Sequence, residues 1–365
     1  MSYLETFQKF KSQNVDSLRG TCYLMCPPEE TEMRVKEKLV HVLERVGSEN
    51  KLVKCYSRSA ADSNMAKPKL LRPFTILKDT INYLLLELTN RTDVPESVLY
   101  DFIDDRLRAV RQDMTIQRLP PEECTILLEP MVRFYVYFGY KLCELPQSKF
   151  DQVLNKKYLL ECMKWYLSCI NQVDKSQVQT DVSSLTKEFA GWNMQPTRLT
   201  CDRILVESLY LLCNLDNVHP LMRYLSLSKD IKCHPTLKLA YRIAMENFRG
   251  NYIVVCMLMK NLCPLTFCAV TLYLPVLQRR ALLVMCSAYS NKQLAVPMEV
   301  VLRWLNFASE QRALAACAHY GLRAEGGALK FLRGDFKTDA QVLPPAKACD
   351  RSFSYEHIFT YNTRA

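Results

Sequence analysis

Apolar residues recur at helical spacing along most of the chain. Two stretches keep a period of 3.6 residues most clearly, and their apolar positions are Leu77, Ile81, Leu84, Leu85 and Leu88 in one and Leu99, Ile103, Leu107, Val110 and Met114 in the other. Further helices are predicted over 123–144, 155–172, 200–214, 235–249, 251–262 and 277–289. Proline and glycine separate these segments, as is usual at helix ends. No strict repeat period is visible, but antiparallel helix pairs suit these lengths, so we predict a mainly all-α, TPR-like helical-repeat array.

The pattern changes in the last part of the chain. One short helix is predicted over 297–307, and Ser309 is placed to cap a second helix over 310–320. Gly326 and Gly327 then separate two short extended runs, which is the signal of a hairpin turn. Helix, helix and hairpin in this order is the layout of a winged-helix module. We predict such a module at the C-terminal end of the array.

The first 70 residues are predicted to form an extended arm that carries one helix. Pro27 and Pro28 favour extended backbone before them and mark the start of that helix. The predicted organisation has four parts, which are the arm over 1–70, a helical-repeat domain over 71–296, a winged-helix domain over 297–345 and a tail over 346–365.

The composition is that of a packed protein. Hydrophobic residues make up 49% of the chain and only 9 residues are glycine, which excludes a fibrous or disordered chain and favours helices over a turn-rich β-fold. The N-terminus is polar and has no apolar signal core. Many of the 16 cysteines lie inside apolar helical stretches, where a reduced cysteine acts as a small hydrophobe. The expected compartment is therefore reducing, which means the nucleus or the cytoplasm.

One uncharged stretch, 261–278, is apolar enough to raise the question of a membrane span. It is barely long enough to cross a bilayer, and Pro264 and Pro275 interrupt it. A pair of buried helices is the better interpretation, and no membrane partner is expected.

The net charge of +10 is unevenly distributed along the chain. The segment 223–280 holds nine Lys or Arg against only Asp230 and Glu246, a local balance of +7. Such a segment suits contact with a nucleic acid or an acidic partner. A solvated helix face explains the same charges equally well, so both interpretations stay open.

Residues that commonly carry catalysis form no convincing group in the sequence. The five histidines are scattered, no nucleophile stands in a G-x-S-x-G turn, and there is no Walker loop or GxGxxG sequence. We therefore expect neither an enzyme nor a cofactor.

A metal site has one candidate. Cys22 and Cys26 have the spacing C-x₃-C, but Cys55 and His41 would have to complete the ligand set. The alternative, which we favour, is an extended strip in which Cys22, Leu24 and Cys26 pack on the helical body without a metal.

Three carboxylates in the predicted helix over 100–117 could be taken for a catalytic acidic cluster. They are Asp101, Asp104 and Asp105. The last two lie four and three residues before Arg108, so salt bridges within one helix explain them better.

The polar side of the same helix holds Arg108, Arg111 and Gln112, while its apolar positions face a core. A guanidinium can bind a carboxylate of a neighbouring helix through two hydrogen bonds. We therefore predict that these arginines hold helices together.

Four basic residues lie around the predicted hairpin, and they are Arg323, Lys330, Arg333 and Lys337. Wing residues often contact phosphates, so these four are the candidates for nucleic-acid binding. Such contacts would not depend on base sequence. The alternative is that they are exposed charges that keep the protein soluble.

Four segments carry a family resemblance. They are Gly20-Thr21-Cys22 with Met25-Cys26-Pro27, the run VKCYSRSAA at 53–61, Leu71-Arg72-Pro73, and the run YDFIDDRLRAVRQDMTIQ at 100–117. Together they closely resemble the GANP-type domain of nuclear mRNA-export scaffolds, and 248–252 and 302–307 add to a likeness that covers 20–336. The resemblance marks a set of structural signature residues, which are Arg72, Tyr100, Asp101, Asp104, Arg106, Arg108, Arg111 and Gln112.

The resemblance implies the PCI-type architecture, in which a helical-repeat array ends in a winged helix. It implies a non-catalytic scaffold that pairs with another PCI-domain protein and with a small acidic peptide. Together these would form a platform that binds RNA or DNA and supports mRNA export in the nucleus, at the nuclear pore.

The chain also departs from the large export scaffolds. It shows no Phe-Gly repeats ahead of the domain, no long C-terminal helix for centrin-like partners and no acetyltransferase extension. In this it resembles the short, single-domain branch of the family, whose vertebrate members are associated with centrosomes and the mitotic spindle. The alternative function is therefore a regulator of centrosome duplication or of the spindle that acts through protein contacts in the cytoplasm.

Overall fold

The computed structural model describes residues 18–58, 66–180, 201–347 and 353–363. Helices dominate these residues, which confirms the predicted mainly all-α fold. The chain divides into two compact units, of which the first comprises Met1–Tyr135, Val153–Cys201 and Ser354–Tyr361 and the second comprises Val136–Gln152, Asp202–Phe353 and Asn362–Ala365. The predicted four-part division follows sequence signals rather than these units, and it stays a prediction.

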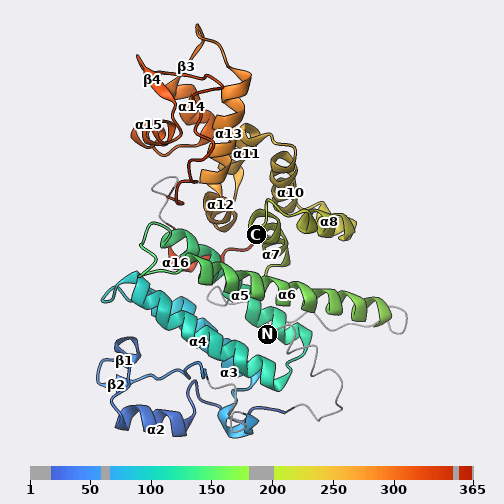
Figure 1. The fold of residues 1–365 in the computed structure, drawn as a ribbon. Coiled ribbons are helices and arrows are strands. Elements are labelled where there is room, and N and C mark those ends of the chain that lie inside the picture. The colour runs from blue at the N-terminus through green and yellow to red at the C-terminus, as the bar shows by residue number, and fades with distance from the viewer. Residues whose placement is uncertain (1–17, 59–65, 181–200, 348–352, 364–365) are drawn as a thin grey trace. The chain divides into compact units, whose positions relative to one another are not determined.

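The first unit is built mainly from helices (Figure 1). They are α2 (Pro28–Lys36), α3 (Phe74–Asn82), α4 (Glu96–Gln117), most of α5 (Pro121–Lys141), α6 (Gln152–Thr180) and α16 (Tyr355–Thr360). A π-helical turn, Tyr83–Glu87, and a 3₁₀ turn, Leu88–Asn90, continue α3. The arm also holds the 3₁₀ turns Val42–Glu44 and Pro68–Leu70 and a short antiparallel hairpin of β1 (Arg45–Val46) and β2 (Glu49–Asn50).

Helix α4 confirms the strongest helical pattern in the sequence. The five predicted apolar positions Leu99, Ile103, Leu107, Val110 and Met114 are all buried. The helix begins after Pro95 and ends at Arg118, which has a left-handed backbone with φ of 50°. Its polar positions are largely buried as well, which an ordinary surface helix does not show. This second buried face is what the arm covers.

The second unit continues the helical array. Its helices are α7 (Arg203–Leu212), α8 (Val218–Ser226), α9 (Lys229–Lys232), α10 (Pro235–Phe248), α11 (Tyr252–Leu258), α12 (Pro264–Thr271), α13 (Leu274–Ala288), α14 (Met298–Leu305) and α15 (Glu310–His319). A 3₁₀ turn, Met259–Asn261, follows α11. The uncharged stretch 261–278 thus forms α12 and the start of α13, and the residues of α12 after Pro264 are buried, as predicted.

No single helix in the described parts of the chain is long and apolar enough to cross a membrane. Helices α12 and α13 pass that test only when they are taken together, and they are bent by 59° at their junction.

The two helices and the hairpin predicted near the C-terminus are present. After α14 and α15 come β4 (Arg323–Glu325) and β5 (Ala328–Lys330), joined through Gly326 and Gly327, which have φ of 57° and 74°. A strand that the sequence did not predict, β3 (Ala295–Pro297), pairs antiparallel with β5, so the sheet order is β3-β5-β4. We call residues 295–337 the C-terminal module. Its assignment to the winged-helix class stays a prediction.

The core of the C-terminal module lies between its helices and β5. Leu329, at the centre of β5, is fully buried together with Val301 and Leu305 of α14. Tyr320 and Phe331 complete the same cluster, which extends to α13. The alternation along β5 buries Leu329 and leaves its neighbours Ala328 and Lys330 half-buried, as expected for a sheet with one covered face.

The predicted tail contains a further helix that belongs to the first unit. Ile358 and Phe359 of α16 are buried. Arg133 of α5 donates from Nη1 to the carbonyl oxygens of Ile358 and Tyr361, at 3.0 and 2.7 Å. Residues near the C-terminus therefore contribute to a core built mainly from the first half of the chain.

Candidate functional site

The polar face of α4 binds two extended segments of the arm, 20–26 and 53–57. Gln117 accepts a hydrogen bond from the backbone N–H of Gly20 at 2.8 Å, and Asp105 accepts one from Tyr56 at 3.1 Å. Gln112 both accepts from the N–H of Ser57 and donates to its carbonyl oxygen. A Cβ on Gly20 would collide with the backbone of residue 71, so this approach requires glycine. The signature run thus acts as a clamp for the arm.

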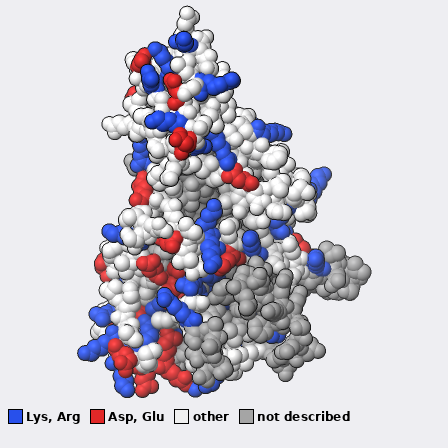
Figure 2. Space-filling view, in the orientation of Figure 1, with Lys and Arg blue, Asp and Glu red and all other residues white. Residues whose placement is uncertain are grey.

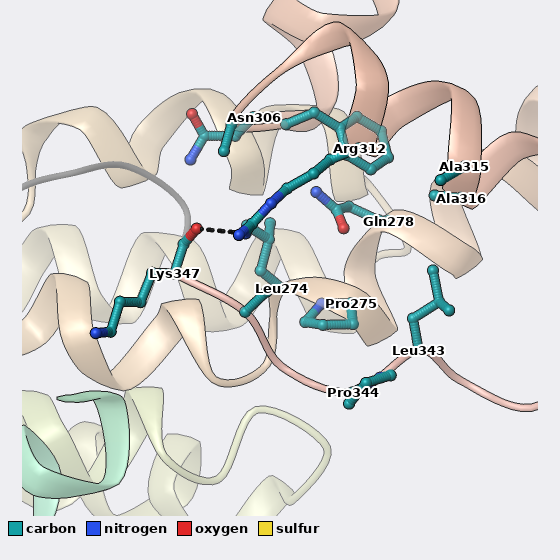
Figure 3. Close-up of a pocket in the computed structure, with 13 residues that line it drawn as sticks. Leu274, Pro275, Gln278, Asn306, Arg312, Ala315, Ala316, Leu343, Pro344 and Lys347 are labelled. Carbon is teal, nitrogen blue, oxygen red and sulfur yellow. Dashed lines mark hydrogen bonds between the residues drawn. The ribbon is translucent and has the colours of Figure 1, made fainter. Parts of the chain in front are cut away.

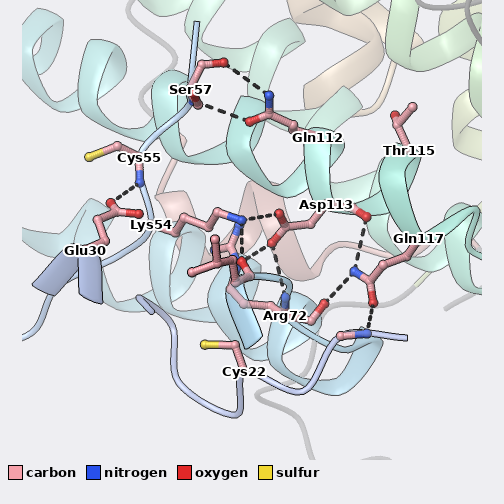
Figure 4. Close-up of polar contacts among 12 residues, drawn as sticks. Cys22, Glu30, Lys54, Cys55, Ser57, Arg72, Gln112, Asp113, Thr115 and Gln117 are labelled. Atoms are coloured by element: carbon pink, nitrogen blue, oxygen red, sulfur yellow. Dashed lines mark hydrogen bonds and ion pairs between the residues drawn. The ribbon is translucent and has the colours of Figure 1, made fainter. Parts of the chain in front are cut away.

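Asp113 lies at the centre of this clamp and is fully buried (Figure 4). Its Oδ2 accepts from Nε of Arg72 at 2.7 Å, and its Oδ1 accepts from Nζ of Lys54 at 2.6 Å. The Arg72 guanidinium also donates to the carbonyl oxygen of Met25, while Lys54 donates to that of Leu70. One carboxylate therefore joins α4 to both extended segments and to the turn before α3.

A second buried carboxylate, Glu44, joins the arm to the middle of α4. It pairs with Arg34 of α2 and with Arg106, and it accepts from the backbone N–H of Val53 at 3.1 Å. Burial by itself raises the pKa of Glu44, but these cations and the N–H outweigh burial and lower it. Glu44 is therefore an ionised structural group.

The structure assigns partners to Asp104 and Asp105 other than the predicted ones. Asp104 accepts from the hydroxyl of Tyr135 in α5 at 2.8 Å, and Asp105 pairs with Arg106 at 2.6 Å. Arg108 instead places its guanidinium 4.0 Å from the ring centre of Tyr56. The prediction that Arg108 forms salt bridges with these acids within the helix is therefore wrong. Both acids point toward neighbouring elements, where a donor compensates their burial.

The other signature residues contact α6. Arg111 reaches Glu161 with 3.4 Å between Nη1 and Oε2, and the hydroxyl of Tyr100 donates to Asn155 at 3.1 Å. Asp101 is exposed on α4. The signature residues other than Asp101 therefore bind helices and arm together and form no open catalytic arrangement.

Asp104 should make stability depend on pH. Burial raises its pKa from the ordinary 3.8 to about 6, against the hydrogen bond from Tyr135, which lowers it. The folded protein then holds this proton more tightly than the unfolded chain. The stabilisation from that proton is complete below pH about 4 and is lost as pH rises through about 6. At neutral pH the buried carboxylate costs up to about 3 kcal/mol, since one pKa unit corresponds to about 1.4 kcal/mol.

Asp104→Asn keeps an acceptor for Tyr135 and removes the charge. We expect the variant to be more stable than the wild type by about 1–3 kcal/mol at pH 7 and equally stable at pH 4. Urea unfolding at the two pH values measures both differences. A variant that is less stable than the wild type at pH 7 would show that Arg108 and Arg111 hold the ionised carboxylate without cost.

The candidate metal ligands do not gather into a metal site. Within the described ranges, no three His, Cys, Asp or Glu side chains are placed to hold a metal ion. His41 caps the 3₁₀ turn that follows it, and burial raises the pKa of Cys26 to about 12 and that of Cys55 to about 11. Cys22 and Cys26 are buried as the favoured interpretation requires, whereas Leu24 between them is exposed.

The predicted nucleic-acid residues are divided between the hairpin and the segment after it. Arg323 and Lys330 lie directly opposite each other on β4 and β5, so their side chains share one face of the sheet. Lys330 is bound to Glu325 at 2.6 Å. Arg333 and Lys337 are exposed after β5.

The C-terminal module is less basic than a phosphate-binding surface usually is. Residues 295–337 contain six Lys or Arg and four Asp or Glu, a balance of +2. On the face shown in Figure 2, basic and acidic side chains alternate over the module at the top of the view. The basic excess of the chain lies in 223–280 instead.

A cavity of about 270 Å³ lies beside the C-terminal module (Figure 3). Its walls come from the start of α13, from α15 and from the extended segment 343–347. The lining is mainly apolar, and it includes Leu274, Pro275, Leu343 and Pro344. Arg312 closes one side, because it donates to the carbonyl oxygen of Lys347 at 2.9 Å and pairs with Glu144 at 3.1 Å.

Several residues of the α4 clamp could not be selected from the sequence as functional. Lys54, Asp113 and Gln117 lie inside the signature segments but have no local signal that distinguishes them from their neighbours. Glu44 and Arg34 lie outside those segments. The only available signal was the presence of acids and amides on the polar side of an unusually long amphipathic helix.

The architecture defines the class of protein as a mainly helical array whose buried polar contacts hold its own elements together. Comparison with known families places it more narrowly. The chain matches the SAC3/GANP family over residues 25–326, and it belongs to that family, which relates to mRNA export.

Three curated relatives illustrate the match. Protein xmas of Drosophila melanogaster is 25% identical over 323 residues, and SAC3 family protein B of Arabidopsis thaliana is 26% identical over 313 residues, with 84% and 82% of this chain covered. SAC3 family protein 1 of Schizosaccharomyces pombe is 32% identical over 139 residues, or 36% of this chain. The aligned parts span only 14%, 17% and 13% of these relatives.

Proposed function

We propose that this chain is a non-catalytic PCI-type scaffold that pairs with another PCI-domain protein in support of nuclear mRNA export. The observation that carries the proposal is the SAC3/GANP match, which runs from the arm through the helical array to the hairpin turn at Gly326. The clamp on α4 supports it, because its charged residues are used in internal contacts rather than in a reaction centre.

The C-terminal module offers a suitable pairing surface. Strand β4 lies at the edge of the sheet, and Arg323, Ala324 and Glu325 are all exposed. An exposed edge strand can add a strand from a partner, so it is a natural place for protein contact. Nucleic-acid binding by Arg323, Lys330, Arg333 and Lys337 is a secondary part of the proposal. The balance of +2 in the C-terminal module predicts a weak contribution from these four alone.

Affinity purification of the tagged chain from dividing cells tests the pairing. We expect a PCI-domain protein and mRNA-export factors to co-purify with the wild type, and the double variant Arg323→Glu with Ala324→Lys to lose most of the PCI-domain protein. Lys164→Glu with Ser168→Lys is the matched charge control at two exposed positions of α6, and it should retain that partner. Recovery of neither a PCI-domain protein nor an export factor would contradict the proposal.

Imaging of the same tagged chain separates the two cellular roles. A nuclear-rim signal supports the export scaffold. Foci at the mitotic poles, without a nuclear-rim signal, would support the alternative role as a centrosome or spindle regulator.

A further inference from the structure

Helix α8 presents three apolar side chains to solvent on one face. Val218, Met222 and Leu225 are 48%, 60% and 55% exposed. Their spacing of four and then three residues places them in one line along the helix. We call these three residues the α8 stripe. Exposed apolar side chains in a continuous line mark interaction sites more often than scattered ones do.

The α8 stripe is not the face with which α8 docks on its own unit. Tyr224 stacks on Tyr241 of α10 with ring centres 3.9 Å apart, and Leu221 is buried. On another side of the helix, Arg223 pairs with Glu207 of α7 at 2.7 Å. In Figure 1, α8 lies beside α10 at the outer edge of the second unit. The fold therefore holds α8 by its other sides and leaves the stripe uncovered within the residues that the structure describes.

One lysine lies at the C-terminal end of the stripe, and two more stand on α9 and α10, the helices that follow α8. Lys232 donates from Nζ to the carbonyl oxygen of Leu225 at 3.0 Å, which places an ammonium beside the last residue of the stripe. Lys229 begins α9, and Lys238 lies one helical turn before Tyr241 on α10. In the described residues, neither Lys229 nor Lys238 has a carboxylate partner, and Asp230 is the one acid between residues 217 and 245.

We propose that the α8 stripe and its lysines bind an amphipathic, acidic helix of another protein. The apolar face of that helix would cover Val218, Met222 and Leu225, and its carboxylates would meet Lys229, Lys232 and Lys238. A nucleic acid fits less well, because its phosphates would satisfy the lysines and leave the aliphatic side chains uncovered. This surface uses no residue of the C-terminal module, so it is independent of the proposed pairing.

The test measures binding of synthetic peptides to the full chain by fluorescence anisotropy. The acidic probe is a labelled peptide of about 18 residues with leucines at helical spacing and flanking glutamates, long enough to form a helix on binding. One control peptide carries lysines in place of the glutamates, and a second control peptide carries serines in place of the leucines. We expect the acidic probe to bind at least about tenfold more tightly than either control peptide.

Three variants locate the contact. Met222→Ser with Leu225→Ser should lower the affinity for the acidic probe by about tenfold or more, as the loss of central anchor residues does. Lys229→Glu with Lys232→Glu should reverse the preference and favour the lysine peptide. Met257→Ser removes a methionine on α11 that is 50% exposed, and it should bind the acidic probe like the wild type. Thermal melting by circular dichroism checks that every variant is folded.

Any of the following three results would overturn the proposal. Equal binding of the acidic and lysine peptides, or no effect of the serine substitutions, would exclude the surface. Tighter binding of an oligouridine probe that is lost only in the Lys229→Glu, Lys232→Glu variant would assign the lysines to RNA. A dimer of the wild type in light scattering that is absent in the Met222→Ser, Leu225→Ser variant would assign the stripe to a second copy of this chain.

Discussion

Replacing Asp113 with asparagine is expected to lower the free energy of unfolding by about 3–5 kcal/mol, the usual cost of removing one partner from a buried ion pair. Asparagine has nearly the shape of aspartate, so packing changes little. The charge is lost, however, and the cations of Arg72 and Lys54 then face each other without a counter-ion. Arg72 has no exposure to water, so hydration cannot compensate the loss.

Chemical denaturation followed by circular dichroism measures this effect, and hydrogen exchange of 20–26 and 53–57 shows whether the arm detaches first. The control is Asp101→Asn on the same helix, which changes an exposed carboxylate and should alter stability by less than about 0.5 kcal/mol. Arg72→Met added to Asp113→Asn should recover part of the loss, because it removes one of the unpaired cations. If Asp113→Asn were as stable as the control, Asp113 would not hold the arm.

The helices were predictable because each has a strong local signal. The line from Leu99 to Met114 predicted a buried face of α4, and all five positions are buried. Ser309 was predicted as an N-cap, and its hydroxyl does accept from the N–H of Arg312. Gly326 and Gly327 predicted a hairpin, and both have positive φ. These features depend on neighbours only a few residues apart, so a single sequence contains the information.

Strand β3 and helix α16 could not be predicted for the opposite reason. β3 has only three residues and ends in Pro297, so it shows no alternation and becomes a strand only because β5 offers it hydrogen bonds. The six residues of α16 are too few to form a stable helix alone. It forms only because it packs on other residues of the first unit, such as Arg133, which lie more than 200 positions earlier in the chain.

The sequence predicted which types of residue form the clamp on α4, but it did not predict which residues pair with one another. The run 100–117 contains most of the residues concerned, but their partners lie far away in sequence. Arg72 and Asp113 are 41 positions apart, and Glu44 and Arg106 are 62 apart. Helical spacing suggested Arg108 for Asp104 and Asp105, because it lies four and three residues after them in the same helix. Tertiary packing instead supplied the hydroxyl of Tyr135 for Asp104 and the N–H of Tyr56 for Asp105, while the adjacent Arg106 pairs with Asp105.

Arg133→Met is expected to release α16 from the first unit and to lower the free energy of unfolding by about 3–5 kcal/mol. Methionine fills a similar volume without the charge. The buried carboxylate of Glu129, 2.7 Å from the guanidinium, then loses its cation, and the carbonyl oxygens of Ile358 and Tyr361 lose their donor. Both losses occur in a site with almost no access to water, where an unpaired polar group is costly.

Hydrogen exchange of 353–361 and limited proteolysis of the C-terminus measure the release, and urea unfolding measures the loss of stability. The matched control is Arg249→Met, which breaks an ion pair with Glu246 on α10. The side chain of Arg249 is 63% exposed, so that pair should contribute less than about 1 kcal/mol. Because α16 is too short to persist alone, detachment should expose Ile358 and Phe359 together rather than one at a time. Normal protection of α16 in Arg133→Met would show that apolar packing of these two side chains holds the helix without the arginine.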